Sequence, residues 1–174
     1  LIYERMRWRR KAKLPTAADF LYDPPDKIEN VRNWWINSRI VVRRLLNKKK
    51  YTQAYKILSN HKLPLKTDSG REAEWLAGWV AIHHLKKPKK SIEHFKKVYE
   101  NTPNESMKAK AAYWISEANG LTNQKNEEVI WLKIASKNKF SFYGQNASIK
   151  LGNFNFKKEK KILLKPDNVD DLLE

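Results

Sequence analysis

The feature that most constrains the fold is a helical segment that occurs twice. Residues 73–85 surround the small residue Gly78 with large side chains at helical spacing, namely Trp75, Leu76, Trp79 and Ile82. This pattern indicates a helix whose backbone lies close to a neighbouring helix. About 38 residues further on, residues 112–118 show a similar pattern, with Ser116 in the place of Gly78. The chain is therefore expected to repeat one helical unit.

A second helix in each unit recurs at nearly the same interval. Two apolar positions separated by one helical turn repeat along the chain and are expected to be buried: Ala54 and Ile57, Ile92 and Phe95, and Val129 and Leu132. A period in the high thirties with two helices per unit is typical of a helical solenoid. The sequence thus predicts an all-α fold, built as a tetratricopeptide-like solenoid of helical hairpins.

Composition agrees with a helical protein that buries large side chains. Seven Trp, seven Tyr and six Phe can fill the space between short helices, and only five Gly argue against a fold rich in turns. The absence of Cys excludes disulfides, thiolate nucleophiles and Cys-based metal sites. The apolar runs are too short to cross a bilayer, so no transmembrane segment is expected.

The charge is strongly positive, and lysine dominates it. The formal net charge is +17, but no arginine follows Arg71. Such charge favours anionic partners, including nucleic acid, acidic lipid surfaces and cell-wall polymers, although lysine-rich coding bias would produce the same composition. Specific nucleic-acid readers depend on arginine for bidentate contacts, so no specific nucleic-acid partner is expected.

Prolines, glycines and lysine-rich turns divide the chain into expected helices. These cover residues 3–13, 17–21, 34–47, 51–60, 72–85, 91–100, 107–119 and 126–138, with a short helix within 140–152. The expected capping residues are Asn33 before 34–47, one of Thr67, Asp68 and Ser69 before 72–85, and a left-handed Gly120 after 107–119.

The domain plan follows from these helices. Residues 1–138 are expected to form a superhelix of about three or more hairpins, and 139–152 to begin a linker region. Residues 153–174 segregate their charges and are expected to be irregular or frayed. The chain begins within a helix-like segment whose charges interrupt any signal-peptide core, which suggests a piece of a longer protein.

The sequence contains no recognisable catalytic motif. Its four histidines lack helical metal-ligand spacing, and they are expected to pack or cap. Neighbouring carboxylates, Glu72 with Glu74 and Glu127 with Glu128, diverge on a helix and are expected on solvated faces. Nucleophile-elbow and phosphate-loop motifs are absent. No catalytic residue, metal site or cofactor is therefore assigned.

Binding candidates come from the basic and aromatic positions. In the helix 34–47, the expected buried side carries Trp35, Ile36, Ile40, Val41 and Leu45, and arginines line another face. The aromatic residues fit either core packing or stacking on a saccharide ring. The basic residues 5–13 fit a solvated face or a docking surface for an anionic polymer. The candidate binding residues are Arg39, Arg43, Tyr55, Tyr99 and Tyr143.

An ordered set of short motifs resembles the soluble lytic murein transglycosylases. The main ones are 74–81 (EWLAGWVA), 113–116 (YWIS) and 142–145 (FYGQ). Further matching pieces are Arg7 to Arg10, Trp34 to Arg39, Tyr51 to Tyr55, His61 to Pro64, His94 and Phe95 with Tyr99, and Ile149 to Gly152. The resemblance covers about residues 5–152 and implies the family's helical superhelix with the start of its linker.

The resemblance also implies a function for the whole family. Its members cleave peptidoglycan between N-acetylmuramic acid and N-acetylglucosamine, using one glutamate as acid and base and the sugar's 6-hydroxyl to form an anhydro product. This chain departs from the family at Ser116 and Glu117, where Gly-Arg is usual, and it lacks the catalytic Glu-Ser and Gly-Leu-Met-Gln pattern. No catalytic residue is carried over.

The resemblance and the charge together predict a noncatalytic periplasmic scaffold that binds or orients murein glycan strands for cell-wall turnover, with other cell-wall proteins as further partners. The alternative is a solenoid adaptor that binds protein or peptide segments. Nonspecific nucleic-acid binding is the least supported hypothesis, because the aromatic residues recur with the same period as the buried positions and do not alternate with exposed arginines.

Overall fold

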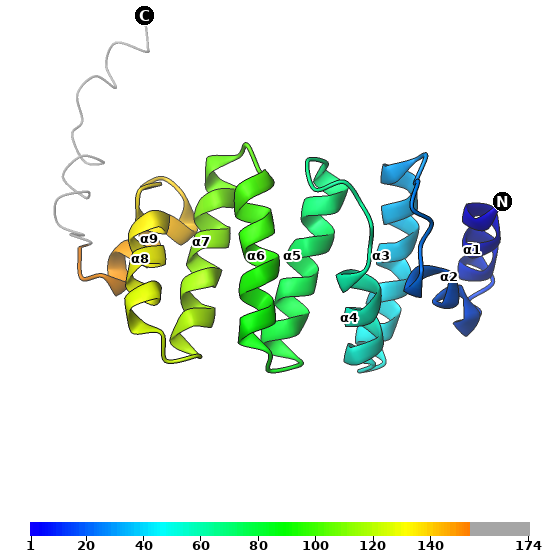
Figure 1. Ribbon diagram of the computed structural model, residues 1–174, viewed down its shortest axis with the longest axis horizontal. Helices are drawn as coiled ribbons and strands as arrows, with labels where there is room; N and C mark the ends of the chain where they lie inside the picture. The colour runs from blue at the N-terminus through cyan, green and yellow to red at the C-terminus, as the bar shows by residue number, and fades with distance from the viewer. Residues whose placement is uncertain (154–174) are drawn as a thin grey trace, which may run out of the picture.

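The computed structural model describes residues 1–153, and this part of the chain is entirely helical (Figure 1). Its elements are α1 (Ile2–Lys11), the 3₁₀ turn η1 (Pro15–Ala17), α2 (Asp19–Tyr22), α3 (Val31–Asn47), α4 (Tyr51–Ser59), α5 (Asp68–His83), α6 (Pro88–Asn101), α7 (Glu105–Gly120), α8 (Lys125–Ser136) and α9 (Phe142–Lys150). The all-α prediction is confirmed. Apart from Asn153, the expected irregular tail 153–174 lies outside the described residues.

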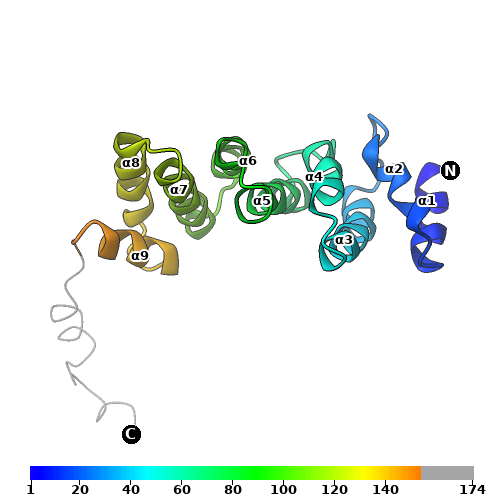
Figure 2. The ribbon, with the colours of Figure 1, turned by 90° about the horizontal axis from the view of Figure 1, so that it is seen from below.

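The helices stand side by side in a row from α1 to α9 (Figure 1). Each of α3 to α8 packs against the next helix along the chain, and α9 contacts both α7 and α8. Seen from below, α3, α5 and α9 lie toward one side of the row, whereas α4, α6 and α8 lie toward the other (Figure 2). Helices α3, α5 and α7 are called the first helices of their hairpins below, and α4, α6 and α8 the second helices.

The close approach predicted at Gly78 is present. A Cβ atom added to Gly78 would lie 2.6 Å from Cε1 of Phe95, which comes from α6 and is completely buried. Ser116 in α7 is also completely buried, and its hydroxyl donates to the carbonyl oxygen of Tyr113. The small residue in the middle of a first helix therefore makes room for its neighbour.

The second helices bury most of the expected positions. In each of the three apolar pairs, the second residue is buried: Ile57 in α4, Phe95 in α6 and Leu132 in α8. Val129 was expected to be buried and is 41% exposed. Helix α8 packs against α7 and the short α9, and in the described part of the chain no further hairpin covers its remaining side.

Helix boundaries differ from the expected ones at several first turns. The cap of α3 is Asn30 and not Asn33: the side-chain oxygen of Asn30 accepts from the backbone N–H of Asn33. Helix α5 begins at Asp68, four residues before the expected start, with Thr67 as its cap. Helix α6 begins at Pro88, because proline fits the first turn, where no backbone donor is needed.

Two further expectations were wrong. Gly120 remains within α7, and the left-handed conformation falls on Asn123 in the following turn. Ile36 is 38% exposed, because α3 turns Trp34, Trp35 and Val41 into the core.

The three hairpin turns share one backbone feature. Each contains a non-glycine residue with a left-handed φ near 58°, at Lys49, Lys86 and Asn123. These residues recur at an interval of about 37, which agrees with a repeating unit. None of the helices within residues 1–153 is long and apolar enough to cross a membrane.

We expect Gly78→Ala to lower the free energy of unfolding by about 1–3 kcal/mol, because the new methyl group meets a buried ring that has no room to move. The matched control is Gly120→Ala. Its Cβ would lie 3.1 Å from the carboxylate of Glu128, the end of a side chain that can move. This control should be neutral or gain up to about 1 kcal/mol from helix propensity. Urea unfolding measures both, and equal effects would contradict the predicted close packing.

Candidate functional site

Two adjoining hollows run along the edge where the first helices begin. One, of about 580 Å³, lies between α5, the loop before α7, α7 itself and the start of α9. The other, of about 520 Å³, lies between α3 and the start of α5. Asp68 lines both hollows. We call them together the Asp68 groove, defined here by Trp35, Arg39, Asp68, Arg71, Glu72, Lys110, Phe142 and Tyr143.

The groove edge is built by a repeated helix cap. In α3, α5, α7 and α9 a capping side chain accepts from the backbone N–H three residues further on, and these caps are Asn30, Thr67, Asn104 and Ser141. The caps follow one another at an interval of 37 residues (67 − 30 = 37). Helices α4, α6 and α8 have no side-chain cap. Because capping satisfies free backbone donors, it fixes the start of each of these four helices along the groove.

Among the cations that define the groove, Lys110 makes the fewest polar contacts with the rest of the described chain. Its ammonium nitrogen lies 3.7 Å from the centroid of the Trp75 ring and 6.0 Å from that of Tyr143. Burial lowers the pKa of Lys110 below its ordinary value. Within residues 1–153 it has neither an ion-pair partner nor a side-chain hydrogen bond. A partly desolvated ammonium beside aromatic rings is suited to an anionic or hydroxyl-rich ligand.

The other charged groups of the groove form ion pairs and hydrogen bonds with neighbouring residues. Arg71 pairs with Asp68 and donates to the carbonyl oxygen of Lys66 at 2.6 Å. In the adjoining hollow, Glu72 accepts from Arg39 at 2.5 Å and from the indole nitrogen of Trp35 at 2.7 Å. These contacts hold the guanidinium groups of Arg39 and Arg71 in place, whereas the Trp35 ring is buried in the core.

The structure brings two of the five candidate binding residues to this groove, Arg39 and Tyr143. Arg43 is exposed on α3, outside both hollows. Tyr99 lines a separate hollow of about 610 Å³. Tyr55 forms a hydrogen bond with His94 and does not line the groove. All five remain predictions.

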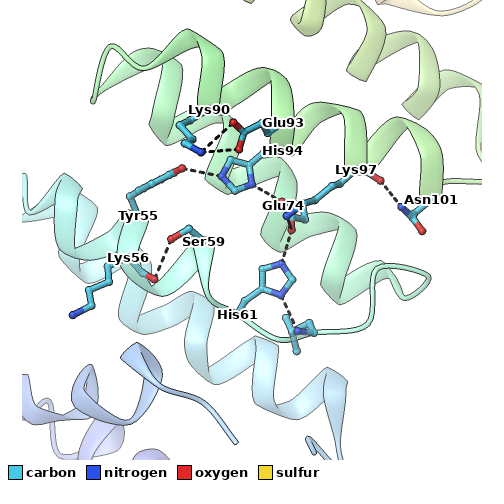
Figure 3. A network of polar contacts seen from close by, with 11 residues as sticks. Tyr55, Lys56, Ser59, His61, Glu74, Lys90, Glu93, His94, Lys97 and Asn101 are labelled. Carbon is cyan, nitrogen blue, oxygen red and sulfur yellow. Dashed lines mark hydrogen bonds and ion pairs between the residues drawn. The ribbon is translucent and has the colours of Figure 1, made fainter. Parts of the chain in front are cut away.

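A buried polar network lies between α4, α5 and α6 (Figure 3). At its centre is Glu74, which is 3% exposed and was expected on a solvated face. Its carboxylate accepts from His94 Nδ1 at 2.5 Å, Lys97 Nζ at 2.9 Å and His61 Nε2 at 3.2 Å. Tyr55 lies within hydrogen-bond distance of the other nitrogen of His94, at 3.0 Å.

The hydrogen bonds fix how the network is protonated. His61 Nδ1 accepts from the backbone N–H of Leu63 at 2.8 Å, so its Nε2 carries the proton that it donates to Glu74. Burial acts to raise the pKa of Glu74, but the hydrogen bonds from His61, His94 and Lys97 outweigh it and hold the pKa well below its usual range. Glu74 is therefore a buried carboxylate anion at neutral pH, which suits a structural role and not proton donation.

The sequence carried one signal that could have placed Glu74 in the core. Residues one helical turn further on, Ala77 and Gly78, are buried and small, so Glu74 shares the packed face of α5. Within residues 1–153, no cluster of His, Asp and Glu has the arrangement of a metal site. Comparisons with protein-family models, with curated proteins and with solved structures found no match to this chain.

We expect Glu74→Gln to lower the free energy of unfolding at neutral pH by about 1–3 kcal/mol, because an amide cannot accept all three donors. The lowered pKa means that the stabilisation by Glu74 is present above the unfolded-state pKa of about 4.3 and is lost as pH falls toward the folded-state value. The difference between the two proteins should therefore shrink as pH falls below about 5.

Thermal and urea unfolding between acid and neutral pH measure this difference. Glu93→Gln is the control, since Glu93 is exposed and, among the described residues, its only ion pair is with Lys90 on the same helix. It should change stability by no more than about 0.5 kcal/mol. A difference between wild type and Glu74→Gln that stays constant at low pH would contradict the assigned charge of Glu74.

Proposed function

We propose that this chain is the noncatalytic superhelical part of a periplasmic peptidoglycan lytic transglycosylase, and that it binds and orients murein glycan strands along the Asp68 groove. The observation that carries the proposal is that two hollows along the starts of α3, α5, α7 and α9 share the lining residue Asp68. An extended hollow across successive hairpins suits a linear polymer better than a compact ligand.

The chemistry of the groove supports a saccharide polymer. Phe142 and Tyr143 at one end of the groove offer aromatic surfaces, and Phe142 is 68% exposed. Aromatic rings provide large contact areas for the apolar faces of sugar rings. Lys110 adds a positive charge for a polymer that carries carboxylates, in keeping with the net charge of +17.

The repeating features support a tetratricopeptide-like solenoid. The helix caps and the left-handed turn residues both recur at about the same interval, with two helices in each unit. Consecutive hairpins contact their neighbours along the row, as a solenoid requires. The resemblance to the transglycosylase superhelix adds the biological setting, peptidoglycan turnover.

The alternative function, an adaptor for protein segments, has one observation in its favour. Phe140 is 98% exposed beside the hollow that contains Tyr99, and Phe142 is exposed two residues later. Exposed aromatic side chains are common anchors in peptide-binding surfaces. Glycan fragments should compete for the site only if the glycan proposal is correct.

A sedimentation assay with insoluble peptidoglycan tests the proposal. The wild-type protein should bind, bind less as salt rises and release no anhydro-sugars. Lys110→Met and Tyr143→Ala should each weaken binding about tenfold, as expected for one charged or aromatic contact. The control is Lys89→Met, which removes an exposed lysine of α6 outside the groove and should have little effect.

Each other outcome has a defined meaning. Binding by both groove variants at the wild-type level would show that the groove is not the site. Absence of binding even at low salt would favour the adaptor. Release of anhydro-sugars would contradict the noncatalytic assignment.

A further inference from the structure

A separate cationic pocket lies at the other end of the row, where η1 and α2 meet the turn between α3 and α4. Its volume is about 310 Å³, within the range of sites for small molecules. Its lining includes four cations, which are Lys13, Arg44, Lys48 and Lys50, and one acid, Asp19. Within residues 1–153 none of the four cations forms an ion pair. We call this cavity the η1 pocket.

Arg44 is the fixed element of the η1 pocket. It lies in the last turn of α3, is half-buried, and donates one guanidinium N–H to the carbonyl oxygen of Arg10 at 2.8 Å. This bond anchors the guanidinium, and Arg44 makes no other side-chain hydrogen bond in the described part of the chain. A held guanidinium with free N–H groups matches the geometry of a phosphate, which it can bind through two parallel hydrogen bonds.

The remaining charges reinforce this preference for an anion. Lys48 and Lys50 flank the pocket from the turn between α3 and α4, and Lys13 faces it from the segment before η1. Asp19 is exposed and is the only carboxylate that the described part of the chain contributes to the lining. The excess of three positive charges over this carboxylate suits a doubly charged anion better than a single carboxylate group.

The neutral walls favour a ligand with an organic portion. Apolar contacts come from Leu14, Pro15, Val41 and Leu45. Tyr22, Thr16 and Gln53 supply polar groups, and Asp19 can accept from a hydroxyl group. A free phosphate ion would leave these walls without contacts.

We propose that the η1 pocket binds the phosphomonoester group of a small, hydroxyl-bearing ring compound. Arg44 holds the phosphate, Lys48 and Lys50 neutralise its second charge, and the apolar wall covers the ring. The site lies outside the Asp68 groove and is independent of glycan binding.

Isothermal titration of the whole protein with glucose 1-phosphate tests the proposal. Inorganic phosphate should bind more weakly, and glucose should not bind measurably. Arg44→Lys keeps the charge but loses the planar fork, so it should weaken glucose 1-phosphate binding about tenfold. Lys50→Gln, an exposed substitution that leaves the core unchanged, should weaken it about threefold.

Lys89→Gln is the control, because it removes the same charge from an exposed position on α6. Thermal unfolding of every variant shows whether it is folded. Vesicles that contain phosphatidic acid test the other source of a phosphomonoester group, a lipid headgroup.

The proposal would be supported if glucose 1-phosphate binds saturably, if Arg44→Lys and Lys50→Gln weaken this binding, and if Lys89→Gln leaves it unchanged. Absence of saturable binding would overturn it, as would equal losses in Lys50→Gln and Lys89→Gln. Binding to the vesicles without binding of glucose 1-phosphate would assign the charge to a lipid surface and also overturn it.

Discussion

The middle of the row depends on one buried charge. Glu74 belongs to α5, but its hydrogen-bond partners come from the segment after α4 and from α6, so a single carboxylate joins three consecutive elements. A carboxylate without these partners would be too costly to bury. The positions of His61 and His94 are therefore coupled to that of α5. Glu74 lies one helical turn before Gly78 and His94 is next to Phe95, so this polar junction adjoins the close contact that sets the spacing of the same helices.

The sequence was most informative where local chemistry decides the structure. Prolines and lysine-rich turns divided the chain into nearly the observed helices, and Gly78 among large residues indicated a close neighbour. Ile57, Phe95 and Leu132 were placed in the core correctly. These inferences needed only helical periodicity and the steric properties of glycine and proline.

The failures involved competition between neighbours or contacts distant in sequence. Asn30 and Asn33 are both good caps, and the sequence alone did not show which one α3 would use. Val129 has the pattern of a core residue, but its exposure depends on what packs beyond α8. The groove was recognised only in part, through Arg39 and Tyr143. Lys110 was missed because the sequence does not show that it lacks an ion-pair partner within residues 1–153. Nor does it show that Lys110 lies beside Trp75, which comes from another helix.

The repeated caps along the Asp68 groove also bear on how a polymer would be aligned. The caps recur at an equal interval in the sequence, so each capped helix begins with a similar backbone arrangement. A bound strand that shifted by one hairpin would therefore contact a similar stretch of main chain. The side chains beside the caps differ: the second residue after the cap is Arg32 in α3 and Tyr143 in α9. The register of a bound strand would therefore be chosen by side chains alone, and exchanging residues between equivalent positions would move the preferred register without altering the fold.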